Sequence, residues 1–261
     1  MNYGLYLSAS GVLTNRYCQD VFSNNLANVN TPGYKPDIPL LTAREPEAVE
    51  DIMQFEFSDE LLDRLGGGVF AGPQFVDTTS SPARRTEGLL DAAIVPDNTY
   101  FVVQSTEPTE SGQSVRLTRT GEFVRNDEGY LVTAAGGYKV LDATGRPIQL
   151  DLNAALEINS SAQLLVNGEA AHDLALTSIA DPARLRKQGE NLLTWDGPAD
   201  LRIAPPTREV KPGFIELSGV NPVKALTQVI ESTKALTASG NLIRYHDLLM
   251  DRAVNTLGVV A

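Results

Sequence analysis

The fold of this chain is decided near its start, in the stretch LYLSASGVLTNRYCQDVFSNNLANVNTPGYK, residues 5–35. Within it Tyr6, Ala9, Leu13, Tyr17 and Val21 recur at steps of three or four, which places them on one face of a helix. We therefore predict an amphipathic helix of about six or seven turns. Its apolar stripe is too narrow for a buried core helix, so the helix needs a partner.

The end of this stretch predicts an abrupt stop, because an asparagine-rich run leads into Thr31-Pro32-Gly33-Tyr34. Pro32 lacks an N–H and restricts Thr31 to extended conformations. A Pro-Gly pair suits the central positions of a type II turn, where the glycine adopts the positive φ. We predict a fixed turn here, defined by Asn28, Thr31, Pro32, Gly33 and Tyr34.

The composition allows a folded, acidic protein. The chain has 261 residues, 42% of them hydrophobic, which is enough for one large domain or two smaller ones. Its net charge of −12 argues against nucleic acid and anionic lipid as partners, because both require concentrated Lys and Arg. Cys18 is the only cysteine, and we expect a buried apolar residue rather than a reactive thiol. We also expect no membrane span and no cleaved secretory signal.

The middle of the chain, from about Val69 to Val210, is typical of a β domain. Short apolar runs alternate there with turn residues, and the absence of helical patterns between them favours an antiparallel sandwich or barrel. Hairpin turns are predicted at Asn126–Gly129, Asp142–Gly145 and Asn167-Gly168. The candidate strands are 74–79, 90–95, 100–104, 115–120, 122–125, 130–133, 139–141, 148–150, 156–158, 164–166, 174–179 and 201–204.

A second helix is predicted at the C-terminal end. Asn221 is a suitable N-cap and Pro222 suits the first helical position. A stripe with a spacing of seven residues then follows, formed by Val229, Leu236, Ile243, Met250 and Leu257. The expected fold is α+β, in which the N- and C-terminal helices pack together in a coiled-coil-like manner and carry an inserted, mostly antiparallel β domain.

This fold divides the chain into four parts. We place the N-terminal helix and turn at 1–35, an extended arm or linker at 36–70, the β domain at 71–210 and the C-terminal helix at 211–261.

No catalytic constellation stands out in the sequence. His172 and His246 are the only histidines, and neither has an evident triad or metal-ligand partner nearby. With 33 acidic residues, paired carboxylates arise by chance. We expect no enzyme activity, no cofactor, no metal site and no small-molecule substrate. The alternative is a β-rich adhesin or carbohydrate-binding module with helical tails, which needs an exposed aromatic platform; Trp195 is the only tryptophan.

The segment NLANVNTPGYK, residues 25–35, resembles the N-terminal signature of the bacterial flagellar rod and hook proteins. Further segments are similar to other motifs of this family and follow in the family's order. They are LDAAI at 90–94 with FVV at 101–103, LTRTGEF at 117–123, GENLL at 189–193 and GFIELS at 213–218. Length and the single β insertion are most similar to the proximal or distal rod proteins.

The resemblance implies a structural subunit of the flagellar basal-body rod, the drive shaft that transmits torque for motility. It implies export by the flagellar type III apparatus without a cleaved signal, and a place in the periplasmic rod. Its partners would be other copies of itself and neighbouring rod or hook proteins. Residues 1–35 and 211–261 would form the axial core, and the turn would mark where the chain leaves the tube wall. The expected assembly interface is Leu5, Ala9, Leu13, Tyr17, Val21, Leu26, Val229, Leu236, Ile243, Met250 and Leu257.

Overall fold

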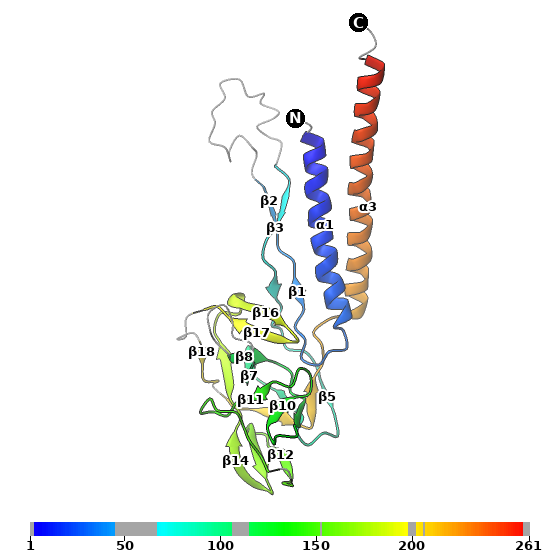
Figure 1. Ribbon diagram of the computed structural model, residues 1–261. Helices are drawn as coiled ribbons and strands as arrows, with labels where there is room; N and C mark the ends of the chain where they lie inside the picture. The colour runs from blue at the N-terminus through cyan, green and yellow to red at the C-terminus, as the bar shows by residue number, and fades with distance from the viewer. Residues whose placement is uncertain are drawn as a thin grey trace. The chain divides into compact units, whose positions relative to one another are not determined.

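The computed structural model describes residues 3–44, 67–105, 115–151, 153–197, 202–205 and 207–257 (Figure 1). It is an α+β protein with an N-terminal helix, a mostly antiparallel β part and a C-terminal helix, as the sequence predicts. The chain forms two compact units. The helical unit consists of Met1–Leu26, Asp37–Gln74 and Asn221–Ala261, and the β unit consists of Ala27–Pro36 and Phe75–Val220.

The helical unit contains the two long helices, α1 (Tyr3–Ala27) and α3 (Pro222–Arg252). A short π-helical segment, η3 (Ala253–Leu257), continues α3. The predicted start of α3 is confirmed, because the side-chain oxygen of Asn221 accepts hydrogen bonds from the N–H groups of Val223 and Lys224, both at 3.1 Å. These bonds satisfy two amides that a helix start otherwise leaves without partners.

A two-stranded ribbon completes the described part of the helical unit. It pairs β2 (Leu41–Ala43) with β3 (Val69–Ala71) in antiparallel register. Ser10 of α1 holds β3, since its hydroxyl donates to the Val69 carbonyl at 2.8 Å and accepts from the Val69 N–H at 3.0 Å. The short strand β1 (Asp37–Ile38) is held by Asn25, whose amide donates to the Asp37 carbonyl at 2.8 Å. Most of the predicted arm at 36–70 lies outside the described residues.

The β unit is built around a nine-stranded sheet whose described pairs are all antiparallel. The order along it is β16-β17-β8-β7-β11-β10-β9, and β15 pairs with both β7 and β18. The bounds are β7 (Thr99–Gln104), β8 (Val115–Thr118), β9 (Phe123–Arg125), β10 (Leu131–Thr133), β11 (Lys139–Val140), β15 (Leu176–Ile179), β16 (Leu185–Gly189), β17 (Leu192–Trp195) and β18 (Arg202–Ile203).

The β unit also contains smaller sheets. A three-stranded meander joins β12 (Leu156–Ile158), β13 (Gln163–Val166) and β14 (Glu169–Asp173). Strand β6 (Ala92–Ile94) pairs with β19 (Val210–Pro212), and β5 (Ala83–Arg85) pairs with β20 (Phe214–Glu216). The remaining elements of the unit are β4 (Phe75–Val76) and the 3₁₀ turn η1 (Pro182–Arg184).

Strand β7 lies at the centre of the β unit's core because both of its faces are buried. Phe101 and Val103 point into one hydrophobic cluster, whereas Tyr100 and Val102 point into another. This follows from the alternation of side chains along a strand. The Phe101 ring meets the Phe123 ring edge to face, with centroids 5.0 Å apart.

The predicted hairpin turns are confirmed. The Gly129 N–H donates to the Asn126 carbonyl at 3.0 Å, and the Gly145 N–H donates to the Asp142 carbonyl at 2.9 Å. Asn167 and Gly168 both have positive φ, +52° and +87°, as a type I′ turn requires.

Most predicted strands are present with shifted ends, but the one at 148–150 is wrong. Several strands were missed, among them β5, β14, β19 and a whole hairpin. Residues 148–150 form only an isolated bridge, because their amides bond to two different neighbours, Val140 and Gly129. The missed hairpin is β16–β17, and its first strand has the polar sequence LRKQG. A strand with a single fully buried side chain, Leu185, gives little apolar signal.

Candidate assembly surface and turn junction

The turn after α1 has the predicted geometry. The Tyr34 N–H donates to the Thr31 carbonyl at 3.3 Å, which closes a four-residue turn over Pro32 and Gly33. Gly33 has φ +68°, the conformation that a type II turn demands at its third position. The Thr31 hydroxyl donates to the Asn28 side-chain oxygen at 3.1 Å and so holds the residues before the turn.

The turn packs directly against the backbone that follows β8. A Cβ atom at Gly33 would lie 2.7 Å from the Arg119 carbonyl carbon and 2.7 Å from the Thr120 nitrogen. The Pro32 carbonyl accepts hydrogen bonds from the Thr120 hydroxyl at 3.2 Å and from the Asn191 amide at 2.8 Å. Gly33 is therefore required both for its φ and for this close approach.

A buried cluster of three charges lies beside the turn. Lys35, Arg119 and Glu216 have side chains that are only 2%, 2% and 3% exposed. Lys35 Nζ lies 2.7 Å from Glu216 Oε1, and Arg119 Nε lies 2.6 Å from Glu216 Oε2. Burial lowers the pKa of the Lys35 ammonium, and the neighbouring Glu216 carboxylate opposes that effect.

The same turn is bonded to the segment that precedes α3. The Gly33 N–H donates to the Glu216 carbonyl at 2.8 Å, and the Gly219 N–H donates to the Tyr34 carbonyl at 2.9 Å. The Tyr34 ring is buried, with the Lys187 ammonium 3.8 Å from its centroid. The predicted turn residues therefore lie together, whereas Lys35, Arg119 and Glu216 were missed as site residues although each lies in a motif quoted above.

On α1 the predicted interface residues lie in different environments. Leu13 is 70% exposed and Leu5 is 37% exposed, whereas Val21 is buried. Ala9, Tyr17 and Leu26 are half-buried, and the Tyr17 hydroxyl donates to the Gly72 carbonyl at 3.1 Å. Buried on α1 are Ser8, Thr14, Cys18, Val21 and Asn25. The expectation for Cys18 is confirmed, since the thiol is buried and burial raises its pKa.

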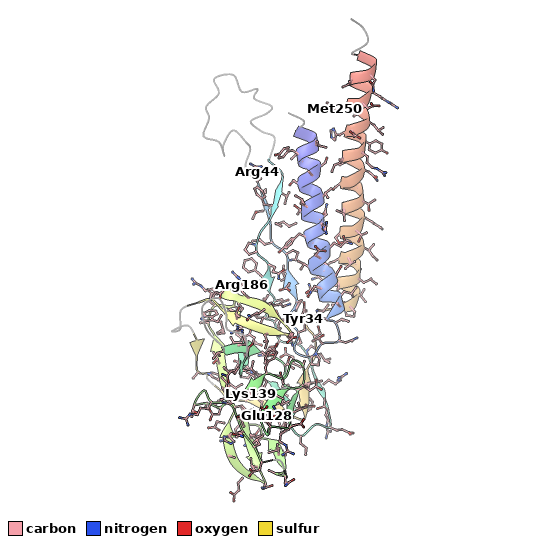
Figure 2. The ribbon with its side chains drawn as sticks, in the orientation of Figure 1. Tyr34, Arg44, Glu128, Lys139, Arg186 and Met250 are labelled. Carbon is pink, nitrogen blue, oxygen red and sulfur yellow. The ribbon has the colours of Figure 1, made fainter. Side chains whose placement is uncertain are left out.

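On α3 the predicted stripe is half-buried along Val229, Leu236 and Ile243. Met250 is 49% exposed and lies toward the C-terminal end of the helix (Figure 2). The side chain of Leu257 lies outside the described residues. A different set of large apolar side chains on α3 is exposed: Val223, Leu226, Ile230, Leu242, Tyr245, Leu248 and Leu249.

Side chains of α1 and α3 also meet within the helical unit, through small and polar groups. The Asn15 amide donates to the Ser239 hydroxyl at 3.3 Å, and the Gln19 amide donates to the Thr233 hydroxyl at 3.2 Å. A Cβ atom at Gly4 would lie 2.6 Å from the His246 ring.

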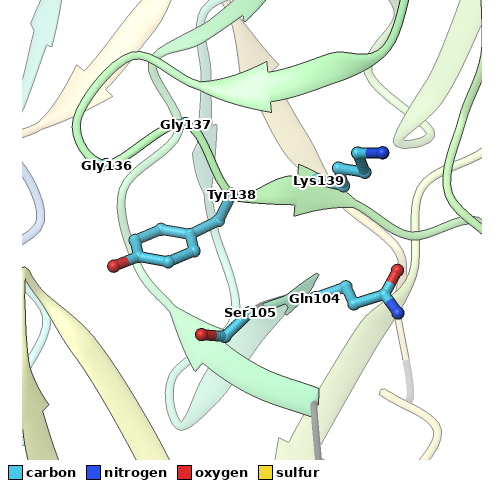
Figure 3. A pocket seen from close by; sticks show the side chains of 6 residues that line it. All are labelled: Gln104, Ser105, Gly136, Gly137, Tyr138 and Lys139. Carbon is cyan, nitrogen blue, oxygen red and sulfur yellow. The ribbon is translucent and has the colours of Figure 1, made fainter. Parts of the chain in front are cut away.

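One hollow in the β unit, of about 230 Å³, is lined by Gln104, Ser105, Gly136, Gly137, Tyr138 and Lys139 (Figure 3). The Tyr138 hydroxyl donates to the Glu190 carboxylate. Lys139 has its ammonium 3.7 Å from the Tyr130 ring centroid and 3.9 Å from a Glu128 carboxylate oxygen. These contacts hold the Tyr138 and Lys139 side chains in place.

The part of the chain that the structure describes contains no cluster of three or more potential metal ligands of the His, Cys, Asp or Glu type. Within the same residues, neither long helix has the apolar length needed to cross a membrane.

Comparison with known proteins gives a family match that includes the turn and relatives that match nearly the whole chain. The family model described as flagella basal body rod protein matches residues 5–35. The flagellar basal-body rod protein FlgF of Rhizobium meliloti (strain 1021) is 28% identical, over 99% of this chain and 99% of its own length. This chain is similar to the flagellar basal-body rod proteins, to their family model over residues 5–35 and to named rod proteins along nearly its whole length.

Other relatives match nearly as far along the chain. The flagellar hook-basal body complex protein FlhO of Bacillus subtilis (strain 168) is 24% identical over 98% of this chain and 99% of its own length. The rod protein FlgG of the same organism is 26% identical over 96% and 97%. The rod-family match ends at Lys35, the residue that enters the buried charge cluster.

Proposed function

We propose that this chain is a structural, non-enzymatic subunit of the bacterial flagellar basal-body rod. The relatives that match this chain along nearly their whole length are named as rod or hook-basal body proteins. The observation that carries the proposal is the row of large apolar side chains left exposed on both helices. On α1 these include Leu13, and on α3 they include Tyr245, 64% exposed.

Exposed apolar rows of this kind favour contact with other proteins. Burying one large apolar side chain stabilises a contact by about 1.5–3 kcal/mol, and contiguous apolar surface marks interaction sites. A contact between different faces of identical subunits produces an open helical assembly when its rotation does not close into a ring. The helices would thus assemble with other copies and with neighbouring rod or hook proteins.

In this proposal α1 and α3 pack together in a coiled-coil-like manner as an axial core, and the β unit is an insertion in the chain between them. The hydrogen bonds from Asn15 to Ser239 and from Gln19 to Thr233 support such a pairing. The proposed division of the chain, with an axial core at 1–35 and 211–261, an arm at 36–70 and a β domain at 71–210, belongs to the same proposal. So do delivery by the type III export apparatus without a cleaved signal, a place in the periplasmic rod, proximal or distal, and torque transmission.

The alternative of an adhesin or carbohydrate-binding module finds no comparable support. Trp195 is half-buried and packs against the second hydrophobic cluster of the β unit, so it does not form an exposed aromatic platform.

The test is incorporation of charge-bearing variants into basal bodies. Leu13→Asp and Tyr245→Asp place a charge on exposed positions of the helices, so the free subunit keeps its fold. Val124→Asp is the matched control, since Val124 is an exposed apolar residue of β9 in the β unit. Each gene would replace the native one, and isolated basal bodies would be probed for the subunit.

We expect the two helix variants to be missing from basal bodies and Val124→Asp to be present at the native level. Circular dichroism of the purified chains checks that all three remain folded. Incorporation of the helix variants at the native level would overturn the proposal.

A further inference from the structure

The buried charge cluster joins three parts of the chain that are far apart in sequence. Lys35 follows the turn, Arg119 follows β8, and Glu216 ends β20. The separations are 181 residues between Lys35 and Glu216 and 97 residues between Arg119 and Glu216. The cluster therefore forms only when the segment after α1 and the segment before α3 have both reached the sheet.

The Glu216 carboxylate is the centre of this cluster. One oxygen accepts from the Lys35 ammonium at 2.7 Å and from the Ser81 N–H at 3.0 Å, and the other accepts from Arg119 Nε at 2.6 Å. Main-chain carbonyls accept further hydrogen bonds from both cations, since the Thr79 carbonyl accepts from Lys35 at 2.6 Å and the Thr99 carbonyl accepts from Arg119 at 2.6 Å. Two buried cations thus share a single buried anion.

Such a cluster is a poor source of net stability but a strong geometric constraint. Desolvation of the three charges offsets most of their attraction. Well-packed apolar residues of similar volume often give a fold equal stability. Removing one member, in contrast, leaves its partners buried without compensation. The folded structure around the cluster is therefore compatible with all three charges in place. Loss of one charge forces the surrounding structure to rearrange.

The main-chain bonds around the cluster tie the two segments to each other. Gly33 bonds to the Glu216 carbonyl, Gly219 bonds to the Tyr34 carbonyl, and the Ser218 hydroxyl donates to the Asn28 carbonyl at 2.9 Å. The apposition is close, because a Cβ atom at Gly219 would lie 2.9 Å from Pro36 Cδ.

We propose that residues 27–36 and 214–220 form one cooperative junction clamp, which the Glu216 carboxylate holds shut. The connections of the β unit to α1 and to α3 then order together and release together, rather than as two independent linkers. In a rod subunit this clamp would be the point where force passes between the helices and the β unit, a consequence that rests on the proposed function. The clamp itself is a property of the β unit and can be tested on the free chain.

The test is hydrogen–deuterium exchange of the full-length chain, followed by mass spectrometry of peptides covering 27–36 and 214–220. Glu216→Gln keeps the size of the side chain but leaves Lys35 and Arg119 without a counter-charge. We expect both peptides to exchange faster together, by on the order of 100-fold or more. Exchange that stays at the wild-type rate, or that rises in one peptide alone, would overturn the clamp.

A control variant separates the clamp from general destabilisation. Leu164→Ala removes a fully buried side chain from β13, in the three-stranded meander. It should accelerate exchange in 156–173 and leave 27–36 and 214–220 at the wild-type rate. Equal acceleration of the two clamp peptides in this control would show that they open only with the whole unit and would overturn the proposal.

Lys35→Met provides a milder variant in case Glu216→Gln does not fold. It leaves one cation, Arg119, against one anion, Glu216, so the charges stay balanced. Because Lys35 lies in the first segment only, acceleration confined to 27–36 would contradict the clamp. We expect 214–220 to accelerate as well, by less than in Glu216→Gln. None of these measurements involves assembly, so failure of the clamp is distinguishable from failure of the rod proposal.

Discussion

The central strand of the β unit and the longest helix of the helical unit bury their side chains in opposite ways. Five of the six residues of β7 are buried, whereas only Ala225 and Ser232 are buried among the 31 residues of α3. On α1 the buried residues are mainly small or polar, as with Ser8 and Thr14. Because burial stabilises in proportion to apolar area, the β unit has a core of its own, whereas the helical unit leaves many of its large apolar side chains exposed.

The largest expected effect contrasts a core residue with an exposed helix residue. Phe101→Ala removes a ring that is fully buried against Phe123, and we expect it to lower the free energy of unfolding of the β unit by about 3–5 kcal/mol. Leu13→Ala should change stability by less than about 0.5 kcal/mol, since Leu13 is exposed. Equilibrium urea unfolding of the free chains measures both. A large loss in Leu13→Ala would mean that the helical unit has a core after all.

A second contrast uses one glycine from each unit. A Cβ atom at Gly121 would lie 1.7 Å from the Ala92 carbonyl oxygen, so Gly121→Ala must displace backbone and should cost about 1–3 kcal/mol or more. A Cβ atom at Gly240 of α3 meets nothing within 4 Å, and Gly240→Ala should stabilise the helix by about 0.5–1 kcal/mol. Thermal unfolding followed by far-UV circular dichroism compares them. The contrast breaks down if both substitutions destabilise the chain.

The cap of α3 should have a smaller effect, confined to the helical unit. Asn221→Ala removes the acceptor of two amide hydrogen bonds and should cost about 1 kcal/mol of helix stability. Asn241→Ala is the control, because Asn241 is exposed within the same helix. Helical circular dichroism should fall at lower temperature in Asn221→Ala only. A loss of β-unit stability in Asn221→Ala would indicate that the two units unfold as one.

A small effect on stability near neutral pH is expected at Tyr100. Burial raises the pKa of its phenol, and within the described residues its hydroxyl has no hydrogen-bond partner. Tyr100→Phe should therefore change stability by less than about 1 kcal/mol at neutral pH.

At alkaline pH the Tyr100 phenol should lower the stability of the folded chain. Above pH of about 10, the unfolded chain loses the phenolic proton while the folded chain keeps it. The folded state then binds more protons, so stability must fall as the pH rises. Tyr100→Phe should remove part of this alkaline loss, as measured by urea unfolding at several pH values. An identical alkaline loss in the variant would contradict the assignment to Tyr100.

Features set by neighbouring residues could be predicted from the sequence. Pro32-Gly33 determines the turn because proline fixes one φ and glycine permits a positive one, and Asn221-Pro222 determines the start of α3 in the same local way. Strand positions followed from apolar alternation, except where a strand is polar, as in β16.

Features that depend on distant residues could not be predicted. No local pattern indicates that Glu216 meets Lys35 and Arg119, since the three charges come together only in the folded chain. The buried face of α1 includes Ser8, Thr14 and Asn25, which a search for apolar periodicity passes over. The assembly interface on the helices stays a prediction.

The single cysteine and the single tryptophan have a practical consequence. Cys18 lies in the helical unit and Trp195 lies in the β unit, so each unit contains one natural spectroscopic or chemical reporter. Burial raises the pKa of the Cys18 thiol and lowers its thiolate fraction, so alkylation proceeds mainly when the helical unit opens. Unfolding of the two units can therefore be measured separately in the unmodified chain. Thiol labelling reports on the helical unit, and indole fluorescence reports on the β unit.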